Sequence, residues 1–270
     1  MSDTPGICIH EEAGWQPPDP LRAELLATLR AMSDAGLNVG TAGNASVRLP
    51  DAGASASAQG QRRQASSGHD TDRAGSPPGE ASPGSARSAS APTSMLISPS
   101  GMPAERCRPQ DMVAVEADGS YTSALAPSSE WKLHHDIYTA FPQAGAVLHA
   151  HAPFATALAC QRRGIPPFHY MIARFGGTTV RCARYATFGT QALSDATVAA
   201  LEGRNACLLA NHGMVVYGRD LAHALALAIE FETLCAQYWR TLQLGDPVLL
   251  SDQEMAEVIE RFRWYGKPRR

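Results

Sequence analysis

The sequence predicts an α/β fold, a central sheet flanked by helices, in a single domain. Two observations lead there. Short apolar strands interleave with amphipathic helical segments along the chain, a pattern that also admits an α+β arrangement. The chain of 270 residues is 44% hydrophobic, which is enough to form one sizeable core.

Composition excludes several broad classes of protein. A formal net charge of −3 gives no basic excess for general nucleic-acid binding. No stretch approaches the roughly 18 apolar residues of a membrane span, and the acidic, proline-broken N-terminus is unlike a signal peptide. The cysteines form no C-x-x-C pair, and we expect them to be reduced in a cytoplasmic protein. They are Cys8, Cys107, Cys160, Cys182, Cys207 and Cys235.

The first ordered element expected is a helix that starts at Pro20, after an N-terminal extension over 1–19. Asp19 is a plausible N-cap, proline suits the first turn, and Gly36 is a stop signal. Apolar residues recur on one face of this helix: Leu21, Leu25, Leu29 and Met32. The domain is expected over 20–266.

Residues 51–94 differ in kind from the rest of the domain. They are rich in Ala, Ser, Gly and Pro and contain no large apolar residue. Such a segment cannot bury enough apolar surface to offset its ordering entropy, so we expect a disordered insertion within the domain. Its charges cancel, and a solvated loop without function is the simplest interpretation.

The remaining elements follow from apolar periodicity and turn residues. Strands are expected over 45–49, 95–97, 111–116, 146–150, 178–182, 206–210 and 214–217. Helices are expected over 129–141, 153–162, 190–201, 220–244 and 251–265. Asp118-Gly119 is typical of a hairpin turn.

The stretch AGAVLHAHAP carries the clearest chemical signal. Side chains at i and i+2 of a strand point the same way, so His149 and His151 can chelate one divalent ion. His212, in the turn after another apolar strand, offers a third imidazole. Three histidines with an open position are typical of catalytic zinc, although Mn²⁺, Co²⁺ and Fe²⁺ also suit these ligands. By itself H-x-H is weak, since nine histidines will sometimes fall at this spacing by chance.

Glu130 precedes the H-x-H strand by one predicted helix. A carboxylate beside a dication can act as a ligand or as a general base. Its position in the first turn of a helix fits an ordinary partner of the helix dipole equally well.

Three turns rich in Ser, Thr and Gly are candidates for binding a phosphate. They are GTAGN (40–44), SPSG (98–101) and PSSE (127–130). Backbone N–H groups and short hydroxyls make such turns suitable for anions, most of all where PSSE opens a helix. Each is more often an ordinary turn. None matches a P-loop or G-x-G-x-x-G, which argues against a nucleotide.

These pieces, in this order, resemble the class II aldolase/adducin family. The resemblance rests on these stretches: GLNVGTAGNASVR, LISPSG, LAPSSEWKLHHDIY, AVLHAHAPFATALA, IPPFHYMIARFGGTTVRCARYATFGT, LLANHG and WYGKP. They cover most of 20–266 apart from the insertion. HYMIA and YATFGT beside the histidines are far more specific than H-x-H alone. The resemblance implies a mixed or mostly antiparallel sheet.

Position by position, the resemblance implies a set of roles. His149, His151 and His212 would bind zinc, with Glu130 as a fourth ligand at rest and as acid/base in the reaction. Tyr170 would reach from a neighbouring subunit of a homotetramer and protonate the aldehyde oxygen. The substrate phosphate would be bound by Thr41, Asn44, Ser100, Gly101, Ser128 and Ser129. The aldehyde end would be shaped by Phe188 and Tyr265.

The reaction implied is aldol cleavage of a ketose 1-phosphate, of the L-fuculose 1-phosphate type, to dihydroxyacetone phosphate and a short aldehyde such as lactaldehyde. Other activities of the family stay open: a 5-deoxypentulose- or methylthioribulose-phosphate aldolase or dehydratase, a sugar-phosphate 4-epimerase, and a non-catalytic adducin-like protein. An epimerase would call for Asp at Glu130. Ser100 and Asn211 depart from the Thr and His of the family pattern, and neither change threatens the mechanism.

Overall fold

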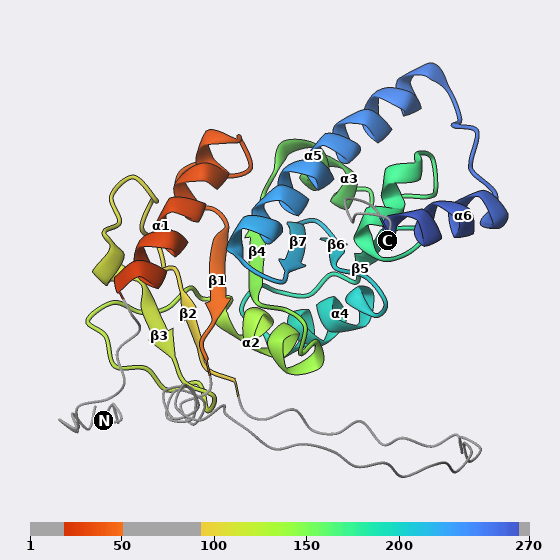
Figure 1. Ribbon diagram of the computed structural model, residues 1–270. Helices are drawn as coiled ribbons and strands as arrows, with labels where there is room; N and C mark the ends of the chain where they lie inside the picture. Colours follow the sequence, from red (N-terminus) through yellow and green to blue (C-terminus); the bar gives the residue numbers. More distant parts are fainter. Residues whose placement is uncertain (1–18, 51–92, 265–270) are drawn as a thin grey trace, which may run out of the picture.

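The computed structural model describes residues 19–50 and 93–264 (Figure 1). Its centre is a 7-stranded sheet in the order β3-β2-β1-β4-β7-β6-β5. Neighbouring strands are antiparallel except β5 and β6, which are parallel. The expected mixed, mostly antiparallel sheet within a single domain is therefore confirmed.

The strands are short and mostly buried. Their bounds are β1 Asn44–Arg48, β2 Met95–Ile97, β3 Val113–Val115, β4 Ala146–Ala150, β5 Arg181–Ala183, β6 Ala206–Leu209 and β7 Gly213–Gly218. The central strand β4 pairs with β1 on one side and β7 on the other, with His149 opposite both Asn44 and Val215. Residues from three separate stretches of the sequence therefore meet beside His149.

Helices cover both faces of the sheet (Figure 1). The α-helices are α1 Asp19–Asp34, α2 Trp131–Ala140, α3 Pro153–Ala159, α4 Gln191–Leu201, α5 Leu221–Leu244 and α6 Asp252–Phe262. Two 3₁₀ helices are η1 Pro109–Asp111 and η2 Tyr170–Phe175. On one face α1, α3 and α5 pack together, α2 and α4 pack on the other, and α6 lies against η2.

Alternation along β4 divides the core into two layers. Leu148 belongs to the cluster with α1, α3 and α5, while Val147 belongs to the cluster with α2 and α4. His149 lies two residues after Val147, so its side chain faces the α2 side. This periodicity positions a polar side chain, with none of its surface exposed, under the N-terminus of α2.

Several boundaries differ from the sequence-based expectation. The helix expected from 129 begins at Trp131, with Glu130 as its N-cap residue and not in its first turn. The turn at Asp118-Gly119 is present, but the segment after it forms no strand, so the hairpin prediction was wrong. The strand expected over 178–182 is Arg181–Ala183, and η2 was not predicted.

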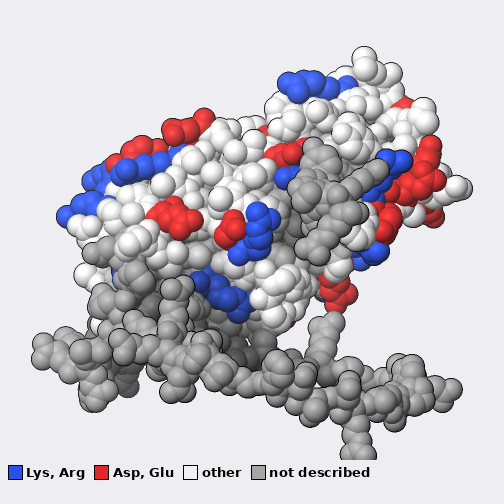
Figure 2. Space-filling view, viewed as in Figure 1, with Lys and Arg blue, Asp and Glu red and all other residues white. Residues whose placement is uncertain are grey.

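Some expectations lie outside the described residues: Cys8, most of the extension over 1–19 and of the insertion over 51–94, and the chain beyond 264. The other five cysteines are free thiols. Within 19–50 and 93–264, no helix has the length and apolarity needed to cross a membrane. On the face in Figure 2, basic and acidic side chains are interspersed.

Candidate active site

The turn between β6 and β7 brings the third histidine to the other two. Asn211 has φ 53°, a left-handed conformation that Asn tolerates better than most residues. A Cβ atom at Gly213 would lie 2.4 Å from the carbonyl oxygen of Ala150, so only glycine fits beside the end of β4. The Asn-His-Gly sequence therefore places His212 against the His149/His151 strand end.

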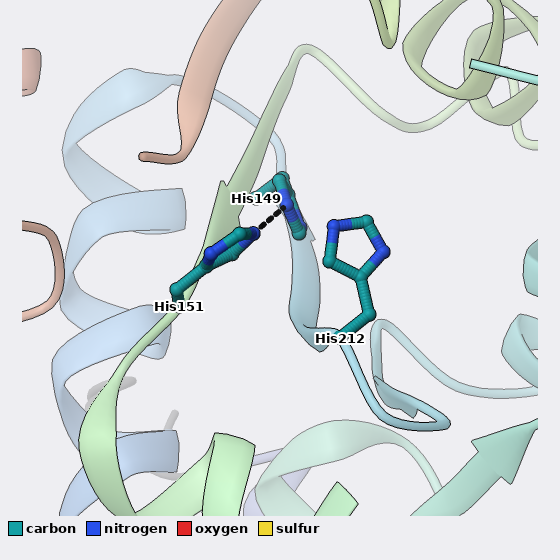
Figure 3. A group of neighbouring side chains, drawn as sticks. All are labelled: His149, His151 and His212. Carbon is teal, nitrogen blue, oxygen red and sulfur yellow. Dashed lines mark hydrogen bonds between the residues drawn. The ribbon is translucent and has the colours of Figure 1, made fainter. Parts of the chain in front are cut away.

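Three imidazoles converge at this point (Figure 3). One ligand nitrogen from each of His149, His151 and His212 lies within 4.8 Å of the others. The ring centroids are 4.9 Å apart for His149 and His151, 4.7 Å for His149 and His212, and 4.9 Å for His151 and His212. All three rings approach edge to face. This is the convergence that the sequence predicted.

The protonation state of the histidines favours a cation between them. Nδ1 of His149 donates to the Met214 carbonyl at 2.9 Å, so the lone pair of this neutral imidazole lies on Nε2. Burial and the neighbouring His151 lower the pKa of His149 to about 3. Burial, followed by the proximity of His149, lowers the pKa of His212 to about 4. A neutral imidazole whose lone pair faces the cluster, as in His149, is suited to bind a metal.

Glu130 completes the cluster from the N-terminus of α2. Its Oε2 lies 3.2 Å from His149 Nε2, and its Oε1 lies 3.4 Å from His212 Nε2. Because Nε2 of a neutral His149 carries a lone pair, the contact with a carboxylate oxygen is not an ion pair. Oε1 is buried and has no hydrogen-bond partner among the residues that the structure describes. Inward lone pairs and an unpartnered carboxylate oxygen fit a divalent cation.

A cavity of about 300 Å³ opens above this cluster. Its lining includes Glu130, His151 and His212, together with all six residues predicted to bind phosphate: Thr41, Asn44, Ser100, Gly101, Ser128 and Ser129. Two of the three turns are joined by backbone hydrogen bonds, from Ser100 N to Ala126 O at 2.9 Å and from Ser128 N to Ser98 O at 3.0 Å. The three turns therefore form one wall next to the histidines.

The predicted aldehyde-end and proton-transfer residues are placed differently. Phe188 lines the same cavity and is 63% exposed. Tyr170 lines a separate cavity of about 510 Å³ beside Arg261 and Phe262, and is 49% exposed. Within its own chain Tyr170 is thus not part of the histidine cavity. Tyr265 lies outside the described residues.

Sequence reasoning missed several residues that contribute to the site. Tyr185 also lines the cavity, and its position in YATFG next to Phe188 was the available signal. Asn38 accepts from the backbone N–H of His151 at 3.3 Å. A Cβ atom at Gly43 would lie 2.2 Å from Asn38 Oδ1, so glycine is required there. His134 contacts Asn44 from the buried face of α2.

Comparison with known proteins agrees with this geometry. The family model for the Class II Aldolase and Adducin N-terminal domain matches residues 23–239. The chain belongs to the class II aldolase/adducin family and is a metal-dependent aldehyde-lyase.

Among characterised relatives, it is 43% identical over 246 residues to the 5-methylthioribulose-1-phosphate/5-deoxyribulose-1-phosphate aldolase of Rhodospirillum rubrum, covering 91% of this chain and 92% of the relative. It is 37% identical over 247 residues to the L-fuculose phosphate aldolase of Escherichia coli K12, covering 91% and 95%. A solved L-fuculose 1-phosphate aldolase superposes with a TM-score of 0.72 at 31% identity, covering 90% and 96%.

Proposed function

We propose that this protein catalyses the reversible, zinc-dependent aldol cleavage of a ketose 1-phosphate to dihydroxyacetone phosphate and a short aldehyde. One observation carries the proposal: a cluster of three histidines and a carboxylate lies at the edge of a cavity of about 300 Å³ whose lining includes His151, His212, Glu130 and the three Ser/Thr/Gly turns. A metal site next to an anion site suits a substrate with a carbonyl close to its phosphate.

The three turns would bind the C1 phosphate. A phosphate dianion can accept hydrogen bonds from backbone N–H groups and from the hydroxyls of Thr41, Ser100 and Ser129. These donor groups are neutral, so no charge on the protein has to be desolvated when the phosphate binds. Ser128 is 6% exposed, and its Oγ accepts from the backbone N–H of Glu130 at 3.3 Å. The phosphate wall is thereby connected to the carboxylate.

His149, His151, His212 and Glu130 would hold the cation. When bound, a divalent metal supplies Lewis-acid polarisation of the ketose oxygens. Zinc suits three imidazoles with an open position, and Mn²⁺, Co²⁺ and Fe²⁺ also accept this ligand set. When substrate enters, Glu130 would leave the cation. It would then act as the acid/base that transfers the proton at the carbon or oxygen next to the breaking bond.

Tyr170 would act from a neighbouring subunit of a homotetramer. It would remove the proton from the hydroxyl that becomes the aldehyde oxygen during cleavage, and would protonate that oxygen in the reverse condensation. Its half-exposed ring, located away from the histidine cavity of its own chain, supports an inter-subunit role. Phe188, and Tyr265 from the C-terminal segment, would shape the aldehyde end. A cytoplasmic location follows from the substrate class, because charged sugar phosphates are retained inside cells.

The preferred aldehyde distinguishes three candidate substrates. L-fuculose 1-phosphate is the substrate implied by the sequence stretches, while the higher identity to the Rhodospirillum rubrum enzyme favours 5-deoxyribulose 1-phosphate or 5-methylthioribulose 1-phosphate. Each bears a 1-phosphate and ends in a methyl or methylthio group. The aromatic rings of Tyr185 and Phe188 at the cavity suit such an apolar end.

A substrate panel tests the proposal. Dihydroxyacetone phosphate release would be measured with the three 1-phosphates, with a matched 5-phosphate, and with and without a chelator. We expect dihydroxyacetone phosphate to be released from the 1-phosphates alone, and this release to be sensitive to the chelator. The kcat/KM values would then rank 5-deoxyribulose, 5-methylthioribulose and L-fuculose 1-phosphates as substrates. Epimerisation without release of a three-carbon product would overturn the aldolase assignment.

A further inference from the structure

A continuous line of buried hydrogen bonds leads from the middle of α2 to the candidate carboxylate. Tyr138 Oη lies 2.8 Å from Ser46 Oγ, and Ser46 Oγ lies 2.7 Å from His134 Nδ1. On its other side, His134 Nε2 contacts Asn44 Oδ1. The Asn44 amide in turn donates from Nδ2 to Glu130 Oε2 at 3.0 Å.

The strand and helix periods explain how this line forms. Asn44 and Ser46 are two residues apart on β1 and face the same side, toward α2. His134 and Tyr138 are four residues apart on α2 and face the sheet together. Tyr138, His134 and Ser46 are fully buried and Asn44 is 4% exposed, so every polar atom depends on these partners.

Chemistry fixes the direction of each hydrogen bond. A carboxylate only accepts, so the NH₂ group of Asn44 must face Glu130 and its carbonyl oxygen must face His134. His134 Nε2 therefore carries a hydrogen. Burial and the proximity of His149 lower the pKa of His134 to about 3, so the imidazole is neutral and Nδ1 accepts from Ser46. Ser46 then accepts from Tyr138.

The consequence is that His134 supports, from behind, the orientation of the Asn44 amide that the carboxylate requires. A primary amide has two orientations of similar shape, and the reversed one would turn the carbonyl oxygen of Asn44 toward the carboxylate of Glu130. The N–H of His134 stabilises only the orientation that donates to Oε2. Oε1, which has no hydrogen-bond partner within 19–50 and 93–264, is then left directed at the histidine cluster.

We propose that His134 is a positioning residue that acts through the Asn44 amide to hold Glu130 in place for cation binding and proton transfer. This inference rests on the proposed function for the role of Glu130, and it gives the Asn44 side chain a task besides lining the phosphate wall. Ser46 and Tyr138 satisfy the far side of His134 with hydroxyls that can donate or accept, and neither residue lines the cavity or belongs to the histidine cluster.

Two substitutions distinguish loss of the His134 N–H donor from loss of the volume that its side chain fills. His134→Gln retains an N–H group near the position of Nε2, whereas His134→Asn is too short to reach Asn44. Both would be made in the wild-type and the Asn44→Ala backgrounds of the full chain. The zinc Kd would be measured by chelator competition, and kcat at saturating zinc would be measured in parallel.

We expect His134→Asn to raise the zinc Kd and to lower kcat by about tenfold each, as for other groups that orient metal ligands. His134→Gln should stay within about threefold of wild type for both quantities. In the Asn44→Ala background, His134→Asn should add less than about twofold, because the residue through which it acts is gone.

Equal zinc Kd values for His134→Asn and wild type would overturn the proposal. Equal losses of zinc affinity and kcat in His134→Asn and His134→Gln would also overturn it. So would an effect of His134→Asn on the zinc Kd that is as large in the Asn44→Ala background as in the wild-type background. If unfolding curves of the zinc-free protein show that His134→Asn has not folded, Ser46→Ala decides: it leaves the donor to Asn44, so a tenfold rise in Kd contradicts the account. If the wild-type protein shows no aldol cleavage but the zinc Kd values of the variants change as predicted in both backgrounds, the proposed function is refuted and the positioning role of His134 is not.

Discussion

Replacement of Glu130 by Gln isolates the charge and basicity of this carboxylate. The residue is 7% exposed, so a side chain of similar volume is needed to keep the packing. The amide oxygen of Gln can still accept from Asn44 Nδ2 in place of Oε2. Its NH₂ group then replaces Oε1 and faces His212 Nε2, which can accept in the tautomer that carries its hydrogen on Nδ1. The fold and the three histidines should therefore be retained.

The magnitude follows from what is lost. An amide cannot accept a proton at neutral pH, and a positioned general base contributes about 10²- to 10⁴-fold, which corresponds to about 3–5 kcal/mol of activation free energy. The phosphate wall is untouched, so KM should change by less than about threefold. Loss of one anionic ligand should weaken zinc binding by about tenfold, in the range seen for supporting groups of metal sites.

The assay is dihydroxyacetone phosphate release at saturating zinc, with zinc content measured on the same samples. Glu257→Gln is the matched control, because the same change there affects an exposed carboxylate on α6. A zinc-loaded Glu130→Gln enzyme with kcat within tenfold of wild type would refute a role for Glu130 in proton transfer.

Three further predictions address the phosphate wall and the scaffold. Ser129→Ala should raise KM about tenfold with kcat little changed, because a hydrogen bond to a charged group contributes about 1.5–3 kcal/mol; a fall in kcat alone would contradict this. Gly43→Ala should lower the free energy of unfolding by more than about 1 kcal/mol, since φ is +74° and Cβ would meet Asn38; unchanged urea denaturation would refute it. Burial raises the pKa of Asp136, but hydrogen bonds from His135, Ser194 and Gln191 outweigh it, and the pKa lies below its ordinary value of 3.8. Asp136→Asn should therefore reduce stability by about 1 kcal/mol above pH 4, and the difference should shrink as pH falls below 3.8; urea denaturation at pH 7 and pH 3 checks this, and a constant difference would contradict it.

Most strands and helices could be predicted because their apolar periods are regular. β4, with AVLHA, was placed at its observed ends, and the helices of the C-terminal half were located within a few residues. The unpredicted element η2 has no such period: six residues after two prolines carry neither a helical repeat nor strand alternation. The hairpin at Asp118-Gly119 failed because a local turn signal does not ensure that the following segment pairs.

The histidine cluster was predictable because its members follow simple rules. His149 and His151 share a strand spacing, and His212 occupies a turn after an apolar strand. His134 was not predictable in the same way, since a histidine within WKLHHDIY has the same helical spacing whether it is buried or exposed. Only the register of β1 against β4 and the packing of α2 bring His134 to Asn44 and thereby to Glu130.

Zinc titration of His212→Ala tests the central claim most directly, because this residue joins the cluster only through the fold. The account predicts that wild type and the control His223→Ala bind a single zinc ion per chain. His212→Ala should lose about 100-fold or more in affinity, since a direct ligand is removed. Wild-type zinc affinity in His212→Ala would contradict the convergence of these three imidazoles on one cation.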